Sequence, residues 1–216
     1  MTIQASSPAA LYCSFMEDIK ARVNRVNKMI SGHSPMKNEG WDGEVMMLFL
    51  RKCMEQLAFS SLIANKDAYA AVHADFATNW KLKNLLSRID KLNPNFYPRP
   101  IRLSHVDDRG IKRMEPVVEG FLSREEMEFL YDATSEVLHT WNPYRTDPRI
   151  VNLGRPLAER VARLQRLLDL HYVQLLDGGM WIVQMNTDPD GRVHAFPSEP
   201  VDTPGRSGQI LPPPLE

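Results

Sequence analysis

The sequence predicts a mainly α-helical fold, a bundle of about five helices with two small β-hairpins and a disordered C-terminal tail. Three observations indicate this fold. Apolar residues recur at three- and four-residue steps in several windows. Residues 44–65 are apolar on nearly every side, which is typical of a helix inside a bundle. The chain after residue 197 is polar and rich in proline, which predicts disorder.

Composition limits the classes of protein to consider. A chain of 216 residues with 43% hydrophobic content suggests one domain with a real core, here residues 9–197. The formal net charge of -1 provides no global attraction to nucleic acid or membrane, so only local patches could bind either. Two cysteines are too few for a disulfide framework and indicate reduced thiols in the cytoplasm. The N-terminus lacks a charged segment followed by an apolar one, so no signal peptide is expected.

The first half of the chain predicts helices. Residues 1–8 are a flexible lead, and residues 9–30 have the period of an amphipathic helix that ends near Gly32. A loop rich in Gly, Pro and Asn precedes the central helix, residues 44–65. That helix is long enough to span a bilayer, but charges near its midpoint favour a soluble protein without membrane contact. An alanine-rich helical piece at 67–76 and an amphipathic helix at 80–92 follow.

The second half mixes hairpins with helices. Three prolines exclude a helix at 93–100, and segments 101–106 and 111–117 flank a turn, which predicts a hairpin. A capping box at Ser123 and Glu126 opens a helix to Leu138. Pro156 opens a last helix expected to reach residue 176, where two glycines stop it. Segments 180–185 and 192–196 predict a second hairpin, and 198–216 form the disordered tail.

The sequence lacks the usual motifs of several kinds of functional site. The six histidines include no pair at a metal-binding helical spacing, and neither cysteine belongs to a CxxC pair. The sequence has no glycine-rich phosphate loop and no serine-hydrolase elbow. We therefore expect no metal and no cofactor.

The first group of candidate residues lies on two predicted helices. Arg51 and Glu55 are four residues apart on the central helix, and Ser135 and His139 have the same spacing on a later one, followed by Asn142. A histidine beside a carboxylate suits acid–base catalysis. The alternative is a buried ion pair that only stabilises the fold, with His139 favoured at its helix end by the macrodipole.

The second group lies on the last predicted helix. Arg160, Arg163 and Arg166 form a basic stripe, which is either a solvated helix face or a site for RNA or another anion. Arg166 and His171 are secondary catalytic candidates. Their five-residue separation turns them apart on a helix, although they could still converge on one ligand at a groove or dimer interface.

The segments LRKCMEQLAF and LYDATSEVLHTWNP together resemble the HEPN-type helical superfamily, in particular uncharacterised bacterial members. The resemblance covers roughly residues 10–176. It implies a bundle of helices, often dimeric. It also implies a metal-independent ribonuclease of a toxin–antitoxin or phage-defence system, or a protein that only binds nucleotides. The ribonuclease motif of that family is Arg, a polar residue, a few more residues and then His. Arg166 and His171 have the spacing, but Leu167 replaces the polar residue.

Two functions follow from these patterns. The first is a HEPN-like endoribonuclease or RNA- or nucleotide-binding protein, in which an imidazole deprotonates a ribose hydroxyl and an arginine stabilises the charge on phosphate. The second is a non-enzymatic binding or regulatory module in which the Arg51–Glu55 pair is structural. RNA or a nucleotide, a protein, or a second copy of the chain are the expected partners.

Overall fold

The computed structural model describes residues 7–65, 82–106, 108, 110, 112–140, 142–144, 146, 151–187 and 189–198. The helical piece predicted at 67–76 and nearly all of the predicted tail, 199–216, lie outside the described residues. The same is true of most of the flexible lead and of Trp141.

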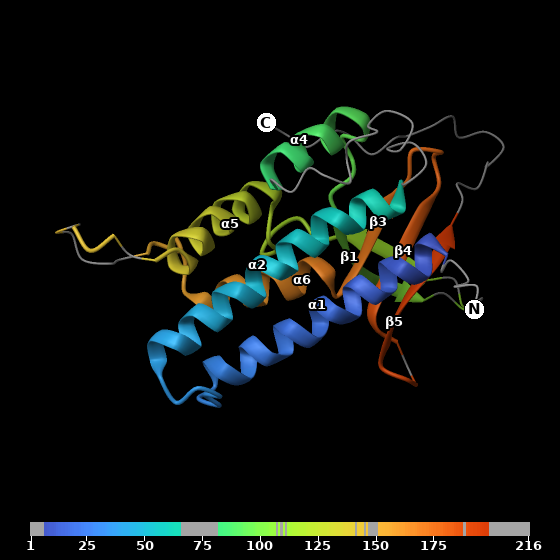
Figure 1. Cartoon of the computed structure of the whole chain (residues 1–216). Coiled ribbons are helices and arrows are strands. Elements are labelled where there is room, and N and C mark those ends of the chain that lie inside the picture. Colours follow the sequence, from blue (N-terminus) through green and yellow to red (C-terminus); the bar gives the residue numbers. More distant parts are fainter. Residues whose placement is uncertain are drawn as a thin grey trace, which may run out of the picture.

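Five described helices and one five-stranded antiparallel sheet make up the fold (Figure 1). The helices are α1 (Pro8–Ile30), α2 (Glu39–Ala64), α4 (Leu82–Leu92), α5 (Arg124–Leu138) and α6 (Leu157–Leu168). The strands are β1 (Arg99–Val106), β2 (Lys112–Pro116), β3 (Leu170–Gln174), β4 (Met180–Thr187) and β5 (Arg192–Ser198), in the order β2-β1-β3-β4-β5. The predicted mainly α class, an all-α helical bundle with two small hairpins, is therefore wrong, because the protein is mixed α/β.

Strand β3 accounts for the error. The last helix, predicted to reach residue 176, ends at Leu168, and the chain continues as a strand. His171 and Val173 are buried while Leu170, Tyr172 and Gln174 are partly exposed, which is the alternation of a strand. Strand β3 pairs with β1 on one side and β4 on the other, so it joins both predicted hairpins into one sheet. The two glycines thought to stop the helix lie in the turn between β3 and β4.

The ends of two helices follow from their capping residues. Helix α5 begins as predicted, since Ser123 Oγ accepts from the Glu126 N–H at 3.2 Å and the Glu126 carboxylate accepts from the Ser123 N–H at 3.2 Å. Helix α2 begins five residues earlier than predicted, at Glu39, because the Asn38 side chain accepts hydrogen bonds from the backbone N–H groups of Gly40 and Trp41.

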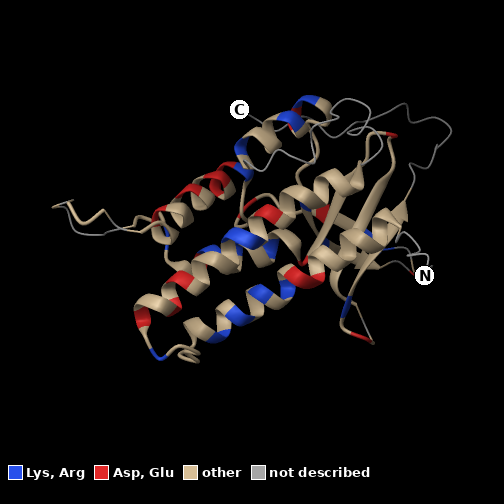
Figure 2. Cartoon of the chain, in the orientation of Figure 1, with Lys and Arg blue, Asp and Glu red and all other residues tan. Residues whose placement is uncertain are grey.

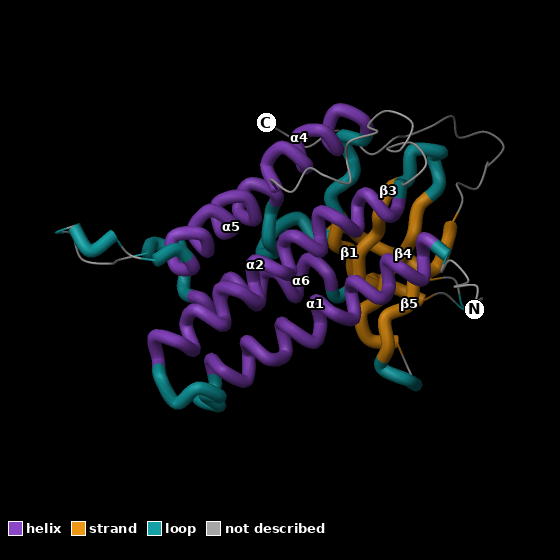
Figure 3. Tube along the Cα trace, viewed as in Figure 1, coloured by secondary structure: helices purple, strands orange, loops and turns teal. Residues whose placement is uncertain are grey.

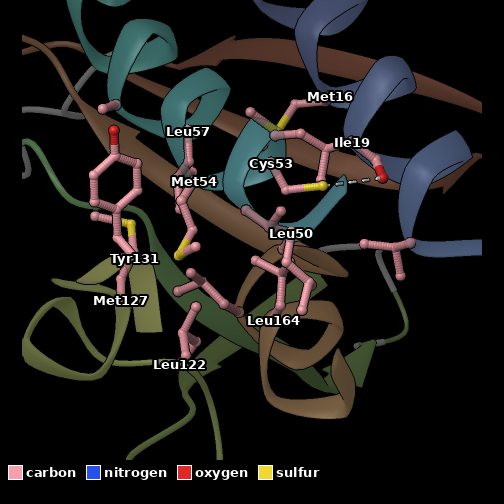
Figure 4. Packing of buried hydrophobic residues seen from close by; sticks show 14 of the residues in the cluster. Met16, Ile19, Leu50, Cys53, Met54, Leu57, Leu122, Met127, Tyr131 and Leu164 are labelled. Carbon is pink, nitrogen blue, oxygen red and sulfur yellow. Dashed lines mark hydrogen bonds between the residues drawn. The ribbon is translucent and has the colours of Figure 1, made fainter. Parts of the chain in front are cut away.

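The helices are arranged around one face of the sheet (Figure 3). Helices α1 and α6 pack directly against the strands, and α2 lies between α1 and α5. One cluster of buried apolar side chains joins these elements; Figure 4 shows part of it, with Met16 and Ile19 from α1, Leu50 and Cys53 from α2, and Leu164 from α6. Both cysteines are free. Burial raises the pKa of the Cys53 thiol to about 12, so it acts as an apolar core residue.

None of the helices that the structure describes is both long and apolar enough to cross a membrane.

Candidate functional site

The structure brings three of the predicted site residues together with a fourth residue, Tyr131. We call Arg51, Glu55, Tyr131 and Ser135 the Arg51 cluster. The guanidinium of Arg51 lies between α2 and α5, with Nε 3.3 Å from Glu55 Oε1. Its Nη1 donates to Ser135 Oγ at 2.5 Å and its Nη2 donates to Tyr131 Oη at 2.6 Å. Each guanidinium nitrogen therefore has a partner within the protein.

The hydroxyl groups of the cluster have consistent roles. The Tyr131 hydroxyl accepts from Arg51 and donates to Glu55 Oε1 at 3.3 Å, and the Ser135 hydroxyl donates to the Tyr131 carbonyl at 3.2 Å. Burial raises the pKa of Tyr131, and the neighbouring Glu55 carboxylate contributes to the rise. The phenol therefore stays protonated near neutral pH and remains a hydrogen-bond donor to Glu55.

Two further contacts stabilise the charges in the cluster. The guanidinium carbon of Arg51 lies 4.1 Å from the centroid of the Tyr131 ring, a cation–π contact between α2 and α5. Lys52 Nζ lies 2.9 Å from Glu55 Oε2, so the carboxylate has a cation at each oxygen. The side chains of Arg51 and Glu55 remain 25% and 22% exposed, so the cluster reaches the surface.

His139 and Asn142 lie farther along the chain, at the end of α5. His139 is the exposed C-cap residue of the helix, and its backbone N–H donates to the Ser135 carbonyl at 3.1 Å. Asn142 lies in the following turn, where its Oδ1 accepts from the Tyr144 N–H at 3.0 Å. The imidazole is thus attached one helical turn beyond Ser135, at the exposed end of α5.

Two arginines of the predicted basic stripe hold loops and helices together. Arg160 is only 4% exposed, and its Nε and Nη2 both donate to the Leu153 carbonyl, at 2.8 and 2.6 Å. Arg163 donates to Glu126 Oε2 through Nη2 at 2.7 Å and Nε at 3.1 Å. Burial opposes ionisation of Glu126, but hydrogen bonds from Arg163 and the Ser123 N–H hold its pKa below the usual value. These contacts fasten α6 to the start of α5.

Arg166 and His171 lie in different environments. Arg166 is exposed on α6 and donates to the Gly120 carbonyl at 3.4 Å. His171 is fully buried on β3, where Nδ1 donates to the Leu168 carbonyl at 2.8 Å and Nε2 accepts from the Tyr12 hydroxyl at 2.9 Å. Burial lowers the pKa of His171 to about 4, so the imidazole is neutral at physiological pH. Both ring nitrogens are satisfied inside the core.

Sequence reasoning did not identify Tyr12 or Tyr131 as polar partners. Tyr131 precedes Ser135 by four residues on one helix, so the spacing could have indicated it as part of the cluster. Tyr12 meets His171 across 159 positions of sequence, and no local pattern signals that contact.

In the part of the chain that the structure describes, no group of three or more His, Cys, Asp or Glu residues is arranged to hold a metal ion.

No protein-family model, curated protein or solved structure matches this chain. The resemblance to the HEPN superfamily therefore stays a prediction.

Proposed function

We propose that this protein is a non-enzymatic binding or regulatory module in which the Arg51 cluster fastens α2 to α5. The observation that supports this proposal is the engagement of all three guanidinium nitrogens of Arg51 by Glu55, Tyr131 and Ser135. An arginine that stabilises charge on a phosphate must direct its N–H groups at that phosphate. Each of the three guanidinium nitrogens of Arg51 instead has a protein oxygen within 3.3 Å.

A substrate that drew the guanidinium away from its three partners would have to break this arrangement. Removing Arg51 from Glu55 would leave a carboxylate that is only 22% exposed without its guanidinium partner. We expect the separation of Arg51 from Glu55 to lower the free energy of unfolding by about 1–3 kcal/mol, between the ranges for exposed and buried ion pairs. The structural role therefore accounts for the cluster without a ligand.

The second candidate function is the metal-independent ribonuclease that the HEPN resemblance implies. The observation that favours it is the position of the exposed His139, one helical turn beyond Ser135, at a cluster that reaches solvent. In this mechanism His139 would take the proton of a ribose 2′-hydroxyl, and Arg51 would leave its protein partners to stabilise the phosphate.

One experiment separates the two candidates. Purified protein is incubated with total RNA in EDTA, beside the His139→Ala and Ser135→Ala variants. A binding module leaves the RNA intact in all three samples. RNA cleavage by the wild type that disappears in His139→Ala, with the circular dichroism spectrum unchanged, would overturn the proposal and establish the ribonuclease.

A further inference from the structure

The face of the sheet that points away from α1 and α6 carries a continuous row of side chains. Cross-strand pairing connects Arg99 to Tyr172, Tyr172 to Ile182, and Ile182 to Phe196. Directly paired residues of an antiparallel sheet project from the same face, so these four side chains form one line across β1, β3, β4 and β5. We call this line the central row.

Two shorter rows lie on either side of the central row, on the same face. Gln174, Met180 and Ser198 form one, and Leu170, Gln184 and His194 form the other. The three rows together are the outer face of the sheet. Every residue of these rows is at least partly exposed, whereas the alternating residues of β3 and β4, such as His171, Val173 and Trp181, are buried under the helices.

Three of the ten side chains of the outer face carry flat rings, those of Tyr172, His194 and Phe196. Phe196 is 46% exposed, and the His194 ring lies nearly parallel to it, with centroids 6.3 Å apart and an interplanar angle of 24°. Tyr172 lies two strands away in the central row. Exposed aromatic rings on a rigid sheet are the platforms on which unpaired bases stack.

Hydrogen-bonding groups without charge flank the rings. The amides of Gln174 and Gln184 and the hydroxyl of Ser198 stand in the two shorter rows. An amide offers both donors and acceptors, and a hydroxyl can act in either sense. Such groups match the edges of bases and the 2′-hydroxyl of ribose, which is a donor and an acceptor.

Strand pairing places the basic residue Arg99 on the outer face, at one end of the central row. The strands contain five Lys or Arg residues and one acidic residue, Glu115, which pairs with Arg102 at 3.2 Å. At the other side of the face Asp190 Oδ2 lies 3.0 Å from His194 Nε2. Strands β3 and β4 contain no charged residue and show neither blue nor red in Figure 2, so the charge lies on the flanking strands. Arg99 ends the central row, with its Nη2 fixed by a 2.5 Å hydrogen bond to Asn95 Oδ1. Arg99 at one end of the central row and Phe196 at the other would hold a phosphate and a base at separate positions.

We propose that the outer face binds single-stranded RNA, with bases on Phe196, His194 and Tyr172 and the phosphate backbone beside Arg99. This inference rests on the proposed function as a binding module and names its ligand. A second copy of the chain fits the face less well. The three rows present ten side chains, whereas a stable protein interface uses about 20–30 residues a side.

The test measures fluorescence anisotropy of a labelled 12-nucleotide RNA of mixed sequence with the full chain in EDTA. We expect Phe196→Ala and Tyr172→Ala each to weaken binding at least about fivefold, the effect of one lost stacking contact. Phe129 on α5 is 45% exposed, nearly as much as Phe196 at 46%, so Phe129→Ala is the matched control and should leave affinity unchanged. Melting temperatures of all variants establish that each one is folded.

Several outcomes would overturn the assignment. Equal affinity for wild type and Phe196→Ala would exclude the outer face, and equal affinity for duplex RNA would indicate backbone attraction without stacking. Equal affinity for DNA of the same sequence would exclude RNA as the specific ligand. A dimer in sedimentation that Phe196→Ala dissociates would assign the face to a second copy. RNA cleavage in EDTA with the binding pattern intact would refute only the non-enzymatic function.

Discussion

Burial of His171 predicts that the protein loses stability at mildly acidic pH, before its carboxylates are protonated. The imidazole is fully buried and its pKa is lowered to about 4, from an ordinary value of 6.5. In the unfolded chain the same group binds a proton near pH 6.5. Between pH 6.5 and 4 the unfolded state therefore holds more protons, and the free energy of unfolding falls as the pH falls.

The pKa difference gives the size of this effect. Shifts of this kind correspond to about 1.4 kcal/mol per pH unit, so the full loss is about 3 kcal/mol and is complete below pH 4. At pH 5 the loss relative to pH 7.5 is about 2 kcal/mol. For a domain of this size that corresponds to a fall in melting temperature of about 4–8 °C. Well above pH 6.5, where the imidazole is neutral in both states, the contribution of His171 does not change with pH.

Urea unfolding at pH 7.5 and pH 5, followed by circular dichroism, measures this loss. The His171→Asn variant cannot titrate, and its amide can still donate to the Leu168 carbonyl that the imidazole contacts at 2.8 Å. We expect its pH-dependent loss to be about 2 kcal/mol smaller than that of the wild type. His33→Asn, at an exposed histidine, is the control and should keep the wild-type loss. Equal losses in the wild type and His171→Asn would refute the argument, as would an NMR titration of His171 near pH 6.5.

Two further predictions concern buried contacts. Tyr12→Phe removes the hydroxyl 2.9 Å from His171 Nε2 and leaves that nitrogen without its buried partner. Urea unfolding should therefore show a fall of about 1–3 kcal/mol in the free energy of unfolding. An unchanged midpoint would contradict the hydrogen bond. Gly154→Ala should destabilise by about 1–2 kcal/mol, since Gly154 has φ +69° and an added Cβ would lie 2.8 Å from Arg160 Nη2. Gly43→Ala, in α2 with open space around it, is its control and should be neutral or stabilising in the same thermal melt.

The parts of the fold that sequence reasoning predicted are those encoded by short-range patterns. Helix α1 follows from three- and four-residue apolar steps, and the start of α5 follows from the capping box of Ser123 and Glu126. Strand β3 was missed because its five residues directly follow α6 and an apolar run that short fits a helix or a strand. Only pairing with β1 and β4, distant in sequence, makes it a strand.

In the candidate site, too, sequence reasoning predicted the contact between residues close in sequence but did not specify those between distant ones. The spacing of Arg51 and Glu55 predicted that they share a helix face, and the structure has them 3.3 Å apart. The contacts of Arg51 with Tyr131 and Ser135 span 80 and 84 positions, so only the packing of α2 on α5 brings these residues together. The basic stripe was predicted from residue spacing on one helix. Spacing alone does not show that the Arg160 side chain turns inward to the Leu153 carbonyl.

A double-mutant cycle on Arg51 and Glu55 tests the structural role of the Arg51 cluster most directly. The free energy of unfolding is measured for the wild type, Arg51→Met, Glu55→Leu and the double variant at pH 7.5. Because the two side chains form one ion pair within a shared hydrogen-bond network, we predict a coupling energy of about 1 kcal/mol or more, with the double variant less destabilised than the sum of the single ones. Additive effects of the two substitutions would contradict the account.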